Sequence, residues 1–423
     1  MRGPTPARPS WQFAPFAETR PGLASRQTPV PVASSCRGAG GHDGRRPALT
    51  TIRAAVLNRS PVAAPYAETR PLAIETLELE APGRGEVLVR VKAAGLCHSD
   101  LSVVNGARPR PVPMALGHEA AGVVEALGDG VDDLAVGDHV VMVFVPSCGH
   151  CVPCAEGRPA LCEPGAAANG AGTLLGGAIR LKHRGQPVHH HIGVSAFAEA
   201  AVVSRNSLVK IDRDLPFAHA ALFGCAVLTG VGAVVNTAAI RAGQSVAVIG
   251  LGGVGLAALL GAKASGAARL VAVDPIPEKR ALALELGASD AIDPREDGAE
   301  AKVKALTGGG VDAAVELAGS VPALDFAYRI TRRGGLTVTG GLAAPTERLA
   351  LAPVTLVAEE RTLKGSYIGS CIPSRDIPRY VALFKAGLLP VDRLLTSTGG
   401  LDDINAALDA LAEGRTVRHV IEM

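Results

Sequence analysis

The pattern of apolar and polar residues divides the chain into segments of different character. Residues 1–51 are rich in Pro, Arg, Gly and Ser with little apolar periodicity, which predicts a disordered N-terminal extension. From Thr51 onward, β-branched runs such as EVLVRVKAAG, AAGVVEALG and DHVVMVF are separated by Gly, Pro or Asp, which indicates short strands. We therefore expect a β-rich, barrel-like domain over residues 52–227.

After about Leu228, strands alternate with helices. The strand-like segments SVAVIG, RLVAVD, VDAAVELAG and GGLTVTGG are interleaved with the Ala/Leu-rich segments AALLGAKASG and PEKRALALELG. This alternation is typical of right-handed βαβ units in a doubly wound parallel sheet. We expect such an α/β domain over residues 228–367. Residues 368–423 no longer alternate, and we expect them to return to the first domain.

One apolar segment, Phe217–Ile240, is long enough to span a bilayer. It contains His219, Asn236 and several glycines and lacks aromatic belts, so we interpret it as buried core. The first thirty residues are broken by prolines and show no secretory signal. A formal charge of +2 over 423 residues gives no electrostatic reason to expect nucleic acid or a membrane as partner. The sequence predicts a cytoplasmic protein that acts on small molecules.

The segment SVAVIGLGGVG predicts a dinucleotide site. Gly250, Gly252 and Gly255 lie between an apolar strand and a helix, where glycines permit a tight turn and let the backbone approach a pyrophosphate. Asp274 ends the next strand, where a carboxylate accepts hydrogen bonds from the adenosine ribose and repels a 2′-phosphate. NAD is therefore favoured over NADP. An ordinary glycine-rich turn is the alternative, and the order of strand, glycines, helix, strand and acid speaks against it.

Half of the eight cysteines lie in the segment CGHCVPCAEGRPALC, at Cys148, Cys151, Cys154 and Cys162. Four thiolates surround a zinc ion tetrahedrally and leave no position for a substrate, so the cluster predicts a structural zinc site. A structural zinc contributes about 10–16 kcal/mol and a disulfide about 2–4 kcal/mol, and a reducing compartment disfavours the disulfide. An iron–sulfur cluster remains the alternative.

Three further candidate ligands are scattered: Cys97 in GLCHSD, His118 in GHEAAG and Cys225 in FGCAVLTG. Taken singly, each is compatible with a buried residue of no special function, since buried cysteine behaves as a small hydrophobic residue. Together, two cysteines and one histidine match the ligands of the catalytic zinc in alcohol dehydrogenase.

From about Thr51 to Met423 the chain resembles the zinc-dependent medium-chain alcohol dehydrogenases, on the joint basis of the five motifs GLCHSD, GHEAAG, CGHCVPCAEGRPALC, FGCAVLTG and VIGLGGVG. The resemblance implies a GroES-like catalytic domain and a Rossmann coenzyme domain, with a zinc-containing cleft between them. It also implies an oxidoreductase that transfers hydride between an alcohol/aldehyde pair and NAD. It further implies a homodimer or homotetramer, formed by extension of the sheet of the α/β domain.

The resemblance also implies roles for individual residues. Cys97, His118 and Cys225 would bind the catalytic zinc, and Cys148, Cys151, Cys154 and Cys162 the structural one. Asp100 would orient His118, Glu119 would lie near the metal, and Ser99 would accept the proton of the alcohol. The implied cofactor-binding residues are His98, Thr229, Gly250, Gly252, Gly253, Val254, Gly255, Asp274, Lys279 and Arg418. The implied substrate-pocket residues are Phe144, His191 and Ile192.

Some residues depart from the family pattern and bear on the substrate. The branch most similar to this chain contains glutathione-dependent formaldehyde dehydrogenase, but Ala166 and Arg108 stand where charges of that enzyme hold glutathione. Ser102 stands where many relatives have a proton-relay histidine. We expect Arg108 and Arg110 at the mouth of the cleft, accepting neutral or acidic alcohols and aldehydes. One alternative is a thiol-adduct or polyol dehydrogenase with the same zinc and NAD chemistry. Another is a non-catalytic relic of the fold, and the intact set of candidate zinc ligands argues against it.

Overall fold

The computed structural model describes residues 49–423. The extension expected over residues 1–51 therefore lies outside the described residues, apart from its last three positions. Thr50 and Thr51 already belong to strand β1, Thr50–Leu57. The first strand thus begins two positions before residue 52, where the first domain was predicted to start.

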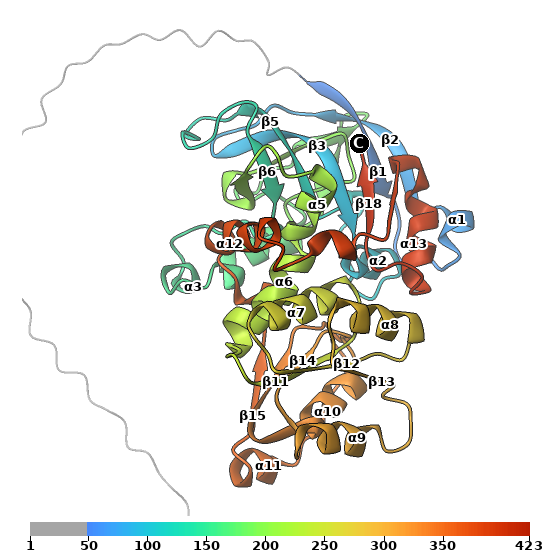
Figure 1. The fold of residues 1–423 in the computed structure, drawn as a ribbon. Helices are drawn as coiled ribbons and strands as arrows, with labels where there is room; N and C mark the ends of the chain where they lie inside the picture. The colour runs from blue at the N-terminus through green and yellow to red at the C-terminus, as the bar shows by residue number, and fades with distance from the viewer. Residues whose placement is uncertain (1–48) are drawn as a thin grey trace, which may run out of the picture. The chain divides into compact units, whose positions relative to one another are not determined.

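Within the described residues, five strands form a small closed barrel of order β1-β2-β7-β8-β4. Figure 1 labels two of them, β1 and β2. Ile52, Ala54 and Val56 alternate along β1 and are buried with Leu77 and Leu79 of β2, as expected for side chains that fill a barrel interior. The other strands of the barrel are β2 (Leu72–Leu79), β4 (Met114–Ala115), β7 (Leu181–His183) and β8 (Gln186–His190).

A second sheet combines strands from the first half of the described chain with two strands near the C-terminus. Its order is β10-β6-β5-β3-β18-β17, and β9 also pairs with β3. These strands are β3 (Glu86–Leu96), β5 (Glu119–Leu127), β6 (His139–Met142), β9 (Ala200–Ser204), β10 (Leu208–Ile211), β17 (Ser397–Gly399) and β18 (His419–Glu422). Because β18 pairs antiparallel with β3, the C-terminus of the chain completes the sheet of the first domain.

The α/β domain contains a parallel sheet of order β13-β12-β11-β14-β15-β16 in the described chain. The strands are β11 (Ser245–Ile249), β12 (Arg269–Val273), β13 (Asp290–Ile292), β14 (Val311–Glu316), β15 (Thr331–Thr339) and β16 (Thr362–Gly365). The chain leaves β11 toward β12 on one side and later returns to β14 on the other. This reversal of strand order creates a crevice at the carboxyl ends of the strands, where ligands bind in such sheets.

Helices lie on both faces of this sheet, and its central strands β11 and β12 are nearly continuous buried apolar runs. The helices of the domain are α7 (Gly253–Ala264), α8 (Pro277–Leu286), α9 (Ala299–Thr307), α10 (Val321–Ile330) and α11 (Pro353–Ala358). The helices outside it are α1 (Tyr66–Thr69), α2 (His98–Val104), α3 (Val152–Ala155), α4 (Glu163–Ala171), α5 (Phe217–Ala221), α6 (Ala226–Gly232), α12 (Pro373–Lys385) and α13 (Ile404–Ala412). The short helical turns are η1 (Pro159–Leu161), η2 (Arg205–Ser207), η3 (Leu222–Gly224), η4 (Ala233–Ala238), η5 (Ile368–Ser370), η6 (Val391–Leu394) and η7 (Leu401–Asp403).

The apolar segment at residues 217–240 forms a bent run of helices that links the two domains. No single helix in the described residues is long and apolar enough to cross a membrane, although the pair 217–224 and 226–238, bent by 51°, passes that test jointly. Most of its residues are buried, as predicted for core. The bend falls at Cys225, and a side chain at Gly224 would collide with the carbonyl oxygen of Met142 on β6. Close packing on β6 therefore positions Cys225.

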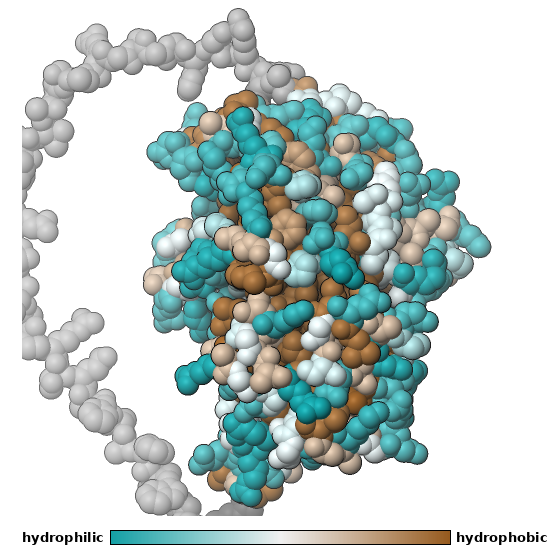
Figure 2. Space-filling model, viewed as in Figure 1, coloured by the Kyte–Doolittle hydropathy of each residue, from teal (hydrophilic) through white to brown (hydrophobic). Residues whose placement is uncertain are grey.

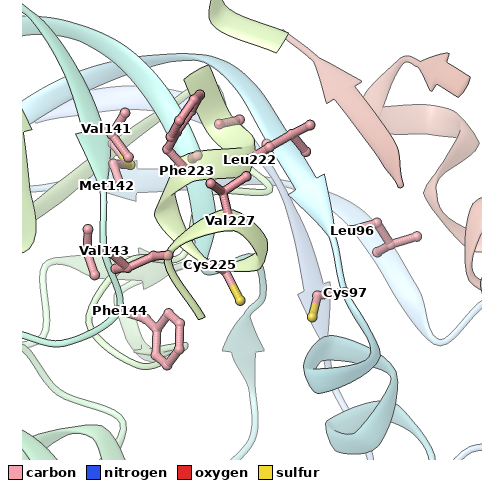
Figure 3. Packing of buried hydrophobic residues seen from close by; sticks show 14 of the residues in the cluster. Leu96, Cys97, Val141, Met142, Val143, Phe144, Leu222, Phe223, Cys225 and Val227 are labelled. Atoms are coloured by element: carbon pink, nitrogen blue, oxygen red, sulfur yellow. The ribbon is translucent and has the colours of Figure 1, made fainter. Parts of the chain in front are cut away.

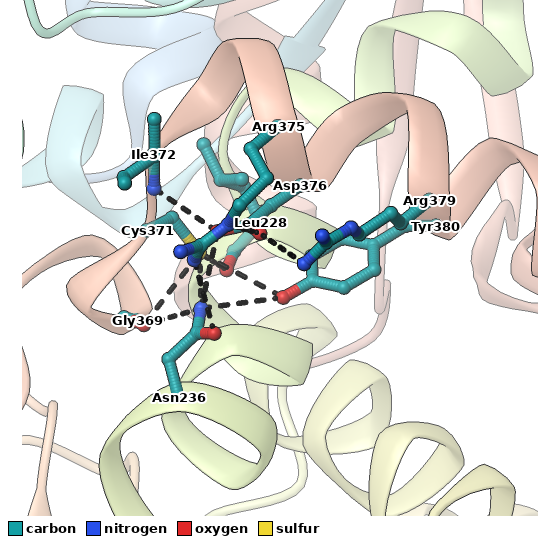
Figure 4. Close-up of polar contacts among 9 residues, drawn as sticks. All are labelled: Leu228, Asn236, Gly369, Cys371, Ile372, Arg375, Asp376, Arg379 and Tyr380. Carbon is teal, nitrogen blue, oxygen red and sulfur yellow. Dashed lines mark hydrogen bonds and ion pairs between the residues drawn. The ribbon is translucent and has the colours of Figure 1, made fainter.

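A buried polar network joins η4 to the C-terminal segment (Figure 4). The Asn236 amide donates to the Gly369 carbonyl at 3.3 Å and to Asp376 Oδ2 at 3.2 Å. The Cys371 thiol donates to the Leu228 carbonyl at 3.1 Å, and burial raises the pKa of that thiol. These bonds connect the linking helices to the start of α12.

Hydrophilic side chains predominate on the face seen in Figure 2, with hydrophobic residues visible between them near its middle.

Candidate active site

The structure brings the three scattered ligand candidates together. The ligand atoms of Cys97, His118 and Cys225 all lie within 4.8 Å of one another, and the three residues are buried. Cys97 follows β3, His118 precedes β5, and Cys225 lies at the bend before α6. Figure 3 shows the sulfur atoms of Cys97 and Cys225 extending toward the same space beside Phe144. Three distant parts of the chain thus meet at one point.

The histidine of this set is oriented by a carboxylate. His118 Nδ1 lies 3.0 Å from Asp100 Oδ1, and both side chains are fully buried. Asp100 also accepts the Cys97 N–H at 3.1 Å and lies 3.2 Å from Nδ1 of His191. Burial alone would raise the pKa of Asp100, but its bonds to His118 and His191 lower it, so the carboxylate stays ionised.

The remaining ring nitrogen of His118 is available to a metal. Its Nε2 atom is buried and has no hydrogen-bond partner among residues 49–423. Leaving a buried polar atom without a partner costs free energy unless a ligand binds it. A hydrogen bond from Cys225 lowers the pKa of Cys97 well below its usual range, although burial opposes this, and the charge of Arg418 adds to the effect. An imidazole nitrogen beside a thiolate fits a zinc ion with a fourth position open.

The four-cysteine segment forms a separate cluster. The sulfur atoms of Cys148, Cys151, Cys154 and Cys162 lie within 4.8 Å of one another, and all seven cysteines of the described chain are free. The backbone N–H of Cys148 donates to Cys162 Sγ at 3.1 Å, and that of Gly165 donates to the same atom at 3.3 Å. Burial raises the pKa of the Cys162 thiol, and these two hydrogen bonds oppose that shift by favouring the thiolate. Four thiol groups at this spacing fit a closed tetrahedral zinc site.

A cleft of about 850 Å³ connects the buried ligand set with the glycine turn. His118, Asp100 and Glu119 lie behind its wall. The predicted site residues that line it are Cys97, His98, Ser99, Phe144, His191, Ile192, Cys225, Thr229, Gly250, Gly252, Gly253, Val254, Gly255, Asp274, Lys279 and Arg418. One cleft thus contains residues of both domains.

The glycine turn after β11 is shaped for a bulky group. Gly250 has φ +89°, which favours glycine, and a side chain at Gly255 would collide with the Gly250 carbonyl oxygen. At Gly252, in contrast, no atom of the described residues other than those of the glycine and its two chain neighbours lies within 4 Å of where a side chain would begin. The turn therefore leaves open space at the N-terminus of α7, where a pyrophosphate would find backbone N–H groups.

Asp274 fixes this turn to the end of β12. Its Oδ2 accepts the Leu251 N–H at 2.8 Å and its Oδ1 accepts the Ile276 N–H at 2.9 Å. The carboxylate is 5% exposed and lines the cleft, so it lies where an adenosine ribose would reach it.

Arg418 lies between the glycine turn and the set of Cys97, His118 and Cys225. A side chain at Gly253 would collide with its guanidinium, which donates to the Leu96 carbonyl at 3.2 Å and lies 3.7 Å from Glu119 Oε2. Glu119 accepts the Ala226 N–H at 3.2 Å, and burial raises its pKa to about 7. The guanidinium is buried and cationic, which suits an anionic group in the turn.

Two protein-family models match the chain: "Alcohol dehydrogenase GroES-like domain" over residues 83–213 and "Zinc-binding dehydrogenase" over residues 253–386. A Mycobacterium tuberculosis protein provisionally named alcohol dehydrogenase D is 41% identical over 356 residues, covering 83% of this chain and 96% of that protein. The chain belongs to the zinc-binding alcohol dehydrogenase family.

Other members of the family are similar along nearly their whole length. The S-(hydroxymethyl)glutathione dehydrogenase of Synechocystis is 36% identical over 367 residues, covering 86% of this chain and 99% of that protein. The crystal structure of benzyl alcohol dehydrogenase from Acinetobacter calcoaceticus superposes with a TM-score of 0.83 at 33% identity, covering 89% of this chain and 100% of that one. The predicted family, fold class and oxidoreductase activity are confirmed.

Several residues of this dehydrogenase line the cleft without having been predicted. They are Val103 of α2, Leu317, Ala318 and Gly319 after β14, Leu342 after β15, and Tyr367 and Ile368 after β16. Most of them follow strands of the parallel sheet. The rule that ligands bind at the carboxyl ends of such strands is the signal that would have identified these loops. Arg108 and Arg110, expected at the mouth, also line the cleft.

Proposed function

We propose that this dehydrogenase oxidises alcohols, or reduces aldehydes, with NAD as the hydride carrier and two zinc ions per chain. One observation supports this above the others: a buried set of two cysteines and one histidine ends in the same cleft as an open glycine turn. The catalytic zinc would be held by Cys97, His118 and Cys225. The second zinc would be held by the four-cysteine cluster.

The chain's own residues would position the substrate and move its proton. Zinc supplies Lewis acidity that lowers the pKa of a coordinated alcohol, and NAD accepts the hydride. Ser99, in the first turn of α2 and on the cleft wall, would accept the alcohol proton. The Ser102 hydroxyl is engaged with the His98 carbonyl at 2.7 Å, so the proton would leave by way of the cofactor ribose or water.

The cofactor and substrate assignments rest on different residues. Asp274, near the expected ribose position, would repel a 2′-phosphate and so favour NAD over NADP. Phe144 and Ile192 form an apolar wall beside His191 and the zinc ligands, which suits the hydrocarbon part of an alcohol. The thiol-adduct alternative is disfavoured because Arg108 lines the cleft where glutathione would require an acidic residue.

The surface supports assembly into a homodimer or homotetramer. β16 forms one end of the parallel sheet, so a second copy would be able to extend it. Val354 and Val357 of α11, just before β16, are 65% and 80% exposed, and Leu342 is 53% exposed. A cytoplasmic location agrees with the free thiols of the described cysteines.

The test is an assay of primary alcohols and aldehydes by NADH absorbance, repeated with NADP and with Cys97→Ser. We expect turnover with NAD, slower turnover with NADP, and two zinc ions per chain by elemental analysis. Cys97→Ser should reduce kcat/KM by about 10³-fold or more, since zinc contributes several kcal/mol to the transition state. A wild-type protein with two zinc ions that turns over no alcohol or aldehyde with either cofactor would contradict the proposal.

A further inference from the structure

Two arginines lie at the substrate end of the cleft. Arg108 and Arg110 follow α2, whose first residue comes directly after the ligand Cys97, and both are half-buried in the cleft wall. Arg108 Nη2 donates to the Leu342 carbonyl at 2.9 Å, and Arg110 Nη1 donates to the Asn169 carbonyl at 3.0 Å. One neutral carbonyl thus holds each guanidinium in place.

The charges of these two arginines are not balanced by the protein. Within residues 49–423, neither guanidinium forms an ion pair with a carboxylate. Among the described residues that line the cleft, Asp274 is the one carboxylate, and it lies at the glycine turn with both oxygens bonded to backbone N–H groups. A guanidinium has five N–H donors, so each arginine keeps donors for another partner.

The electrostatics of the wall agree with this imbalance. Burial lowers the pKa of Arg108; Tyr367 opposes that effect, and the charge of Arg110 adds to it. Burial is also the main reason that the pKa of His191 is lowered, and Arg110 contributes to that shift. Two cations therefore act on each other and on the pocket wall. An anion bound between them would relieve this repulsion.

We propose that Arg108 and Arg110 together bind a carboxylate of the substrate, so the preferred substrates are alcohols or aldehydes with a carboxylate opposite the reacting carbon. This rests on the proposed function, because the reacting carbon is placed at Cys97 and Cys225. Guanidinium groups bind carboxylates through paired, charge-assisted hydrogen bonds. Phe144 and Ile192 line the same cleft and would contact the hydrocarbon between the two ends.

The first test compares three alcohols of one shape on the zinc-loaded enzyme with NAD: 4-(hydroxymethyl)benzoate, 4-(hydroxymethyl)benzamide and 4-(hydroxymethyl)phenyl phosphate. We expect kcat/KM for the carboxylate to exceed that for the amide by about 10- to 100-fold, mainly through KM, since hydrogen bonds to charged groups are stronger by that factor. Equal values would overturn the proposal. A higher kcat/KM for the phosphate would indicate that the two arginines prefer a phosphate ester to a carboxylate. That result would overturn the proposed substrate class.

The second test assigns the preference to the two side chains. Arg108→Gln and Arg110→Gln should each reduce the carboxylate-to-amide ratio, and the double variant should bring it to about threefold or less. Arg59→Gln removes the same charge from an exposed residue outside the cleft and should leave the ratio unchanged. A preference that survives in the double variant would overturn the assignment. If the double variant fails to fold, the single variant Arg108→Glu takes its place. It should shift the substrate preference toward the cationic 4-(aminomethyl)benzyl alcohol, and absence of that shift would contradict the assignment.

A binding measurement separates this proposal from the proposed function. Calorimetric titration of the holoenzyme with benzoate and benzamide requires no turnover. Benzoate should bind at least about tenfold more tightly and weaken as salt rises, because screening reduces attraction between charges. Wild-type protein that binds benzoate selectively but oxidises no alcohol contradicts the proposed function alone. Protein that oxidises alcohols but binds both compounds equally contradicts the carboxylate site alone.

Discussion

The two candidate metal sites are both compact, but their surroundings differ. In each, the ligand atoms lie within 4.8 Å of one another. The four-cysteine cluster comes from one stretch of fifteen residues, 148–162, and three of its cysteines are partly exposed. The set of Cys97, His118 and Cys225 comes from three separate elements and is buried.

This contrast teaches that the number of ligands, together with their surroundings, separates a structural from a catalytic zinc site. The four-cysteine cluster has four sulfur atoms and backbone N–H donors, so the metal coordination would be complete. The buried set has three ligand atoms, a carboxylate at Asp100 that orients one of them, and a cleft on its open side. The first arrangement stabilises a loop, and the second leaves one position for a substrate.

The largest expected effect comes from removing the four-cysteine cluster. Cys148→Ala should reduce the zinc content from two to one per chain. It should also lower the free energy of unfolding by several kcal/mol, a part of the roughly 10–16 kcal/mol that binding of a structural zinc supplies. Elemental analysis and denaturant unfolding measure both quantities. If the variant kept two zinc ions and wild-type stability, the contrast between the sites would be lost.

A matched control is available in Cys371, a buried thiol that belongs to neither cluster. Cys371→Ala removes the hydrogen bond to the Leu228 carbonyl, which should cost about 1 kcal/mol. It should leave two zinc ions bound. The difference between the two variants then measures the metal site and not the loss of a thiol.

The second expected effect tests how the buried set is oriented. Asp100→Asn removes the charge that holds His118, and variants of such supporting carboxylates lose about 10- to 100-fold in activity or metal affinity. We expect a loss of that size in kcat/KM. The stability of the four-cysteine segment should change little. As a control, Asp138→Asn removes a buried carboxylate paired with Lys210 outside the cleft and should retain activity. Equal activities of the two variants would show that Asp100 has no orienting role.

The sequence was informative where a site depends on short spacing. The four-cysteine segment and the glycine turn are each contained in fifteen residues or fewer. The four sulfur atoms lie within 4.8 Å of one another, and the turn leaves open space at Gly252. The three scattered ligands could be grouped only by the resemblance to a family. No local rule relates Cys97 to Cys225, because their proximity depends on the bend at Gly224 and its packing on β6.

Long-range contacts were beyond the sequence for the same reason. Pairing of β18 with β3 and the bond from Arg108 to the Leu342 carbonyl join residues more than two hundred positions apart. The pattern also placed the first strand one residue late, at Thr51, because Thr50 already pairs with Leu79 of β2. A partner across a sheet decides whether such a terminal residue is a strand, and a single sequence does not show that partner.

The smallest expected effect concerns a buried histidine that belongs to neither candidate metal site. His190, at the end of β8, is 1% exposed, and its Nε2 accepts the Arg180 N–H at 3.0 Å. Burial, with the charge of Arg180, lowers its pKa to about 3. In the unfolded chain, histidine has a pKa of about 6.5. At pH values between about 3 and 6.5, the unfolded chain therefore binds a proton at His190 that the folded chain does not bind. Stability is therefore complete above pH 6.5 and decreases as pH falls.

At pH 5.5 this histidine should cost about 1.4 kcal/mol relative to high pH, by proton linkage. His190→Gln keeps an acceptor for the Arg180 N–H but does not titrate, so its unfolding free energy should fall less than that of wild type between pH 7.5 and 5.5, by about that amount. Denaturant unfolding at the two pH values measures this. His183→Gln, the same change in a ring that is 32% exposed, controls for loss of a histidine as such. Identical pH dependence in wild type and His190→Gln would mean that His190 is not held neutral by burial.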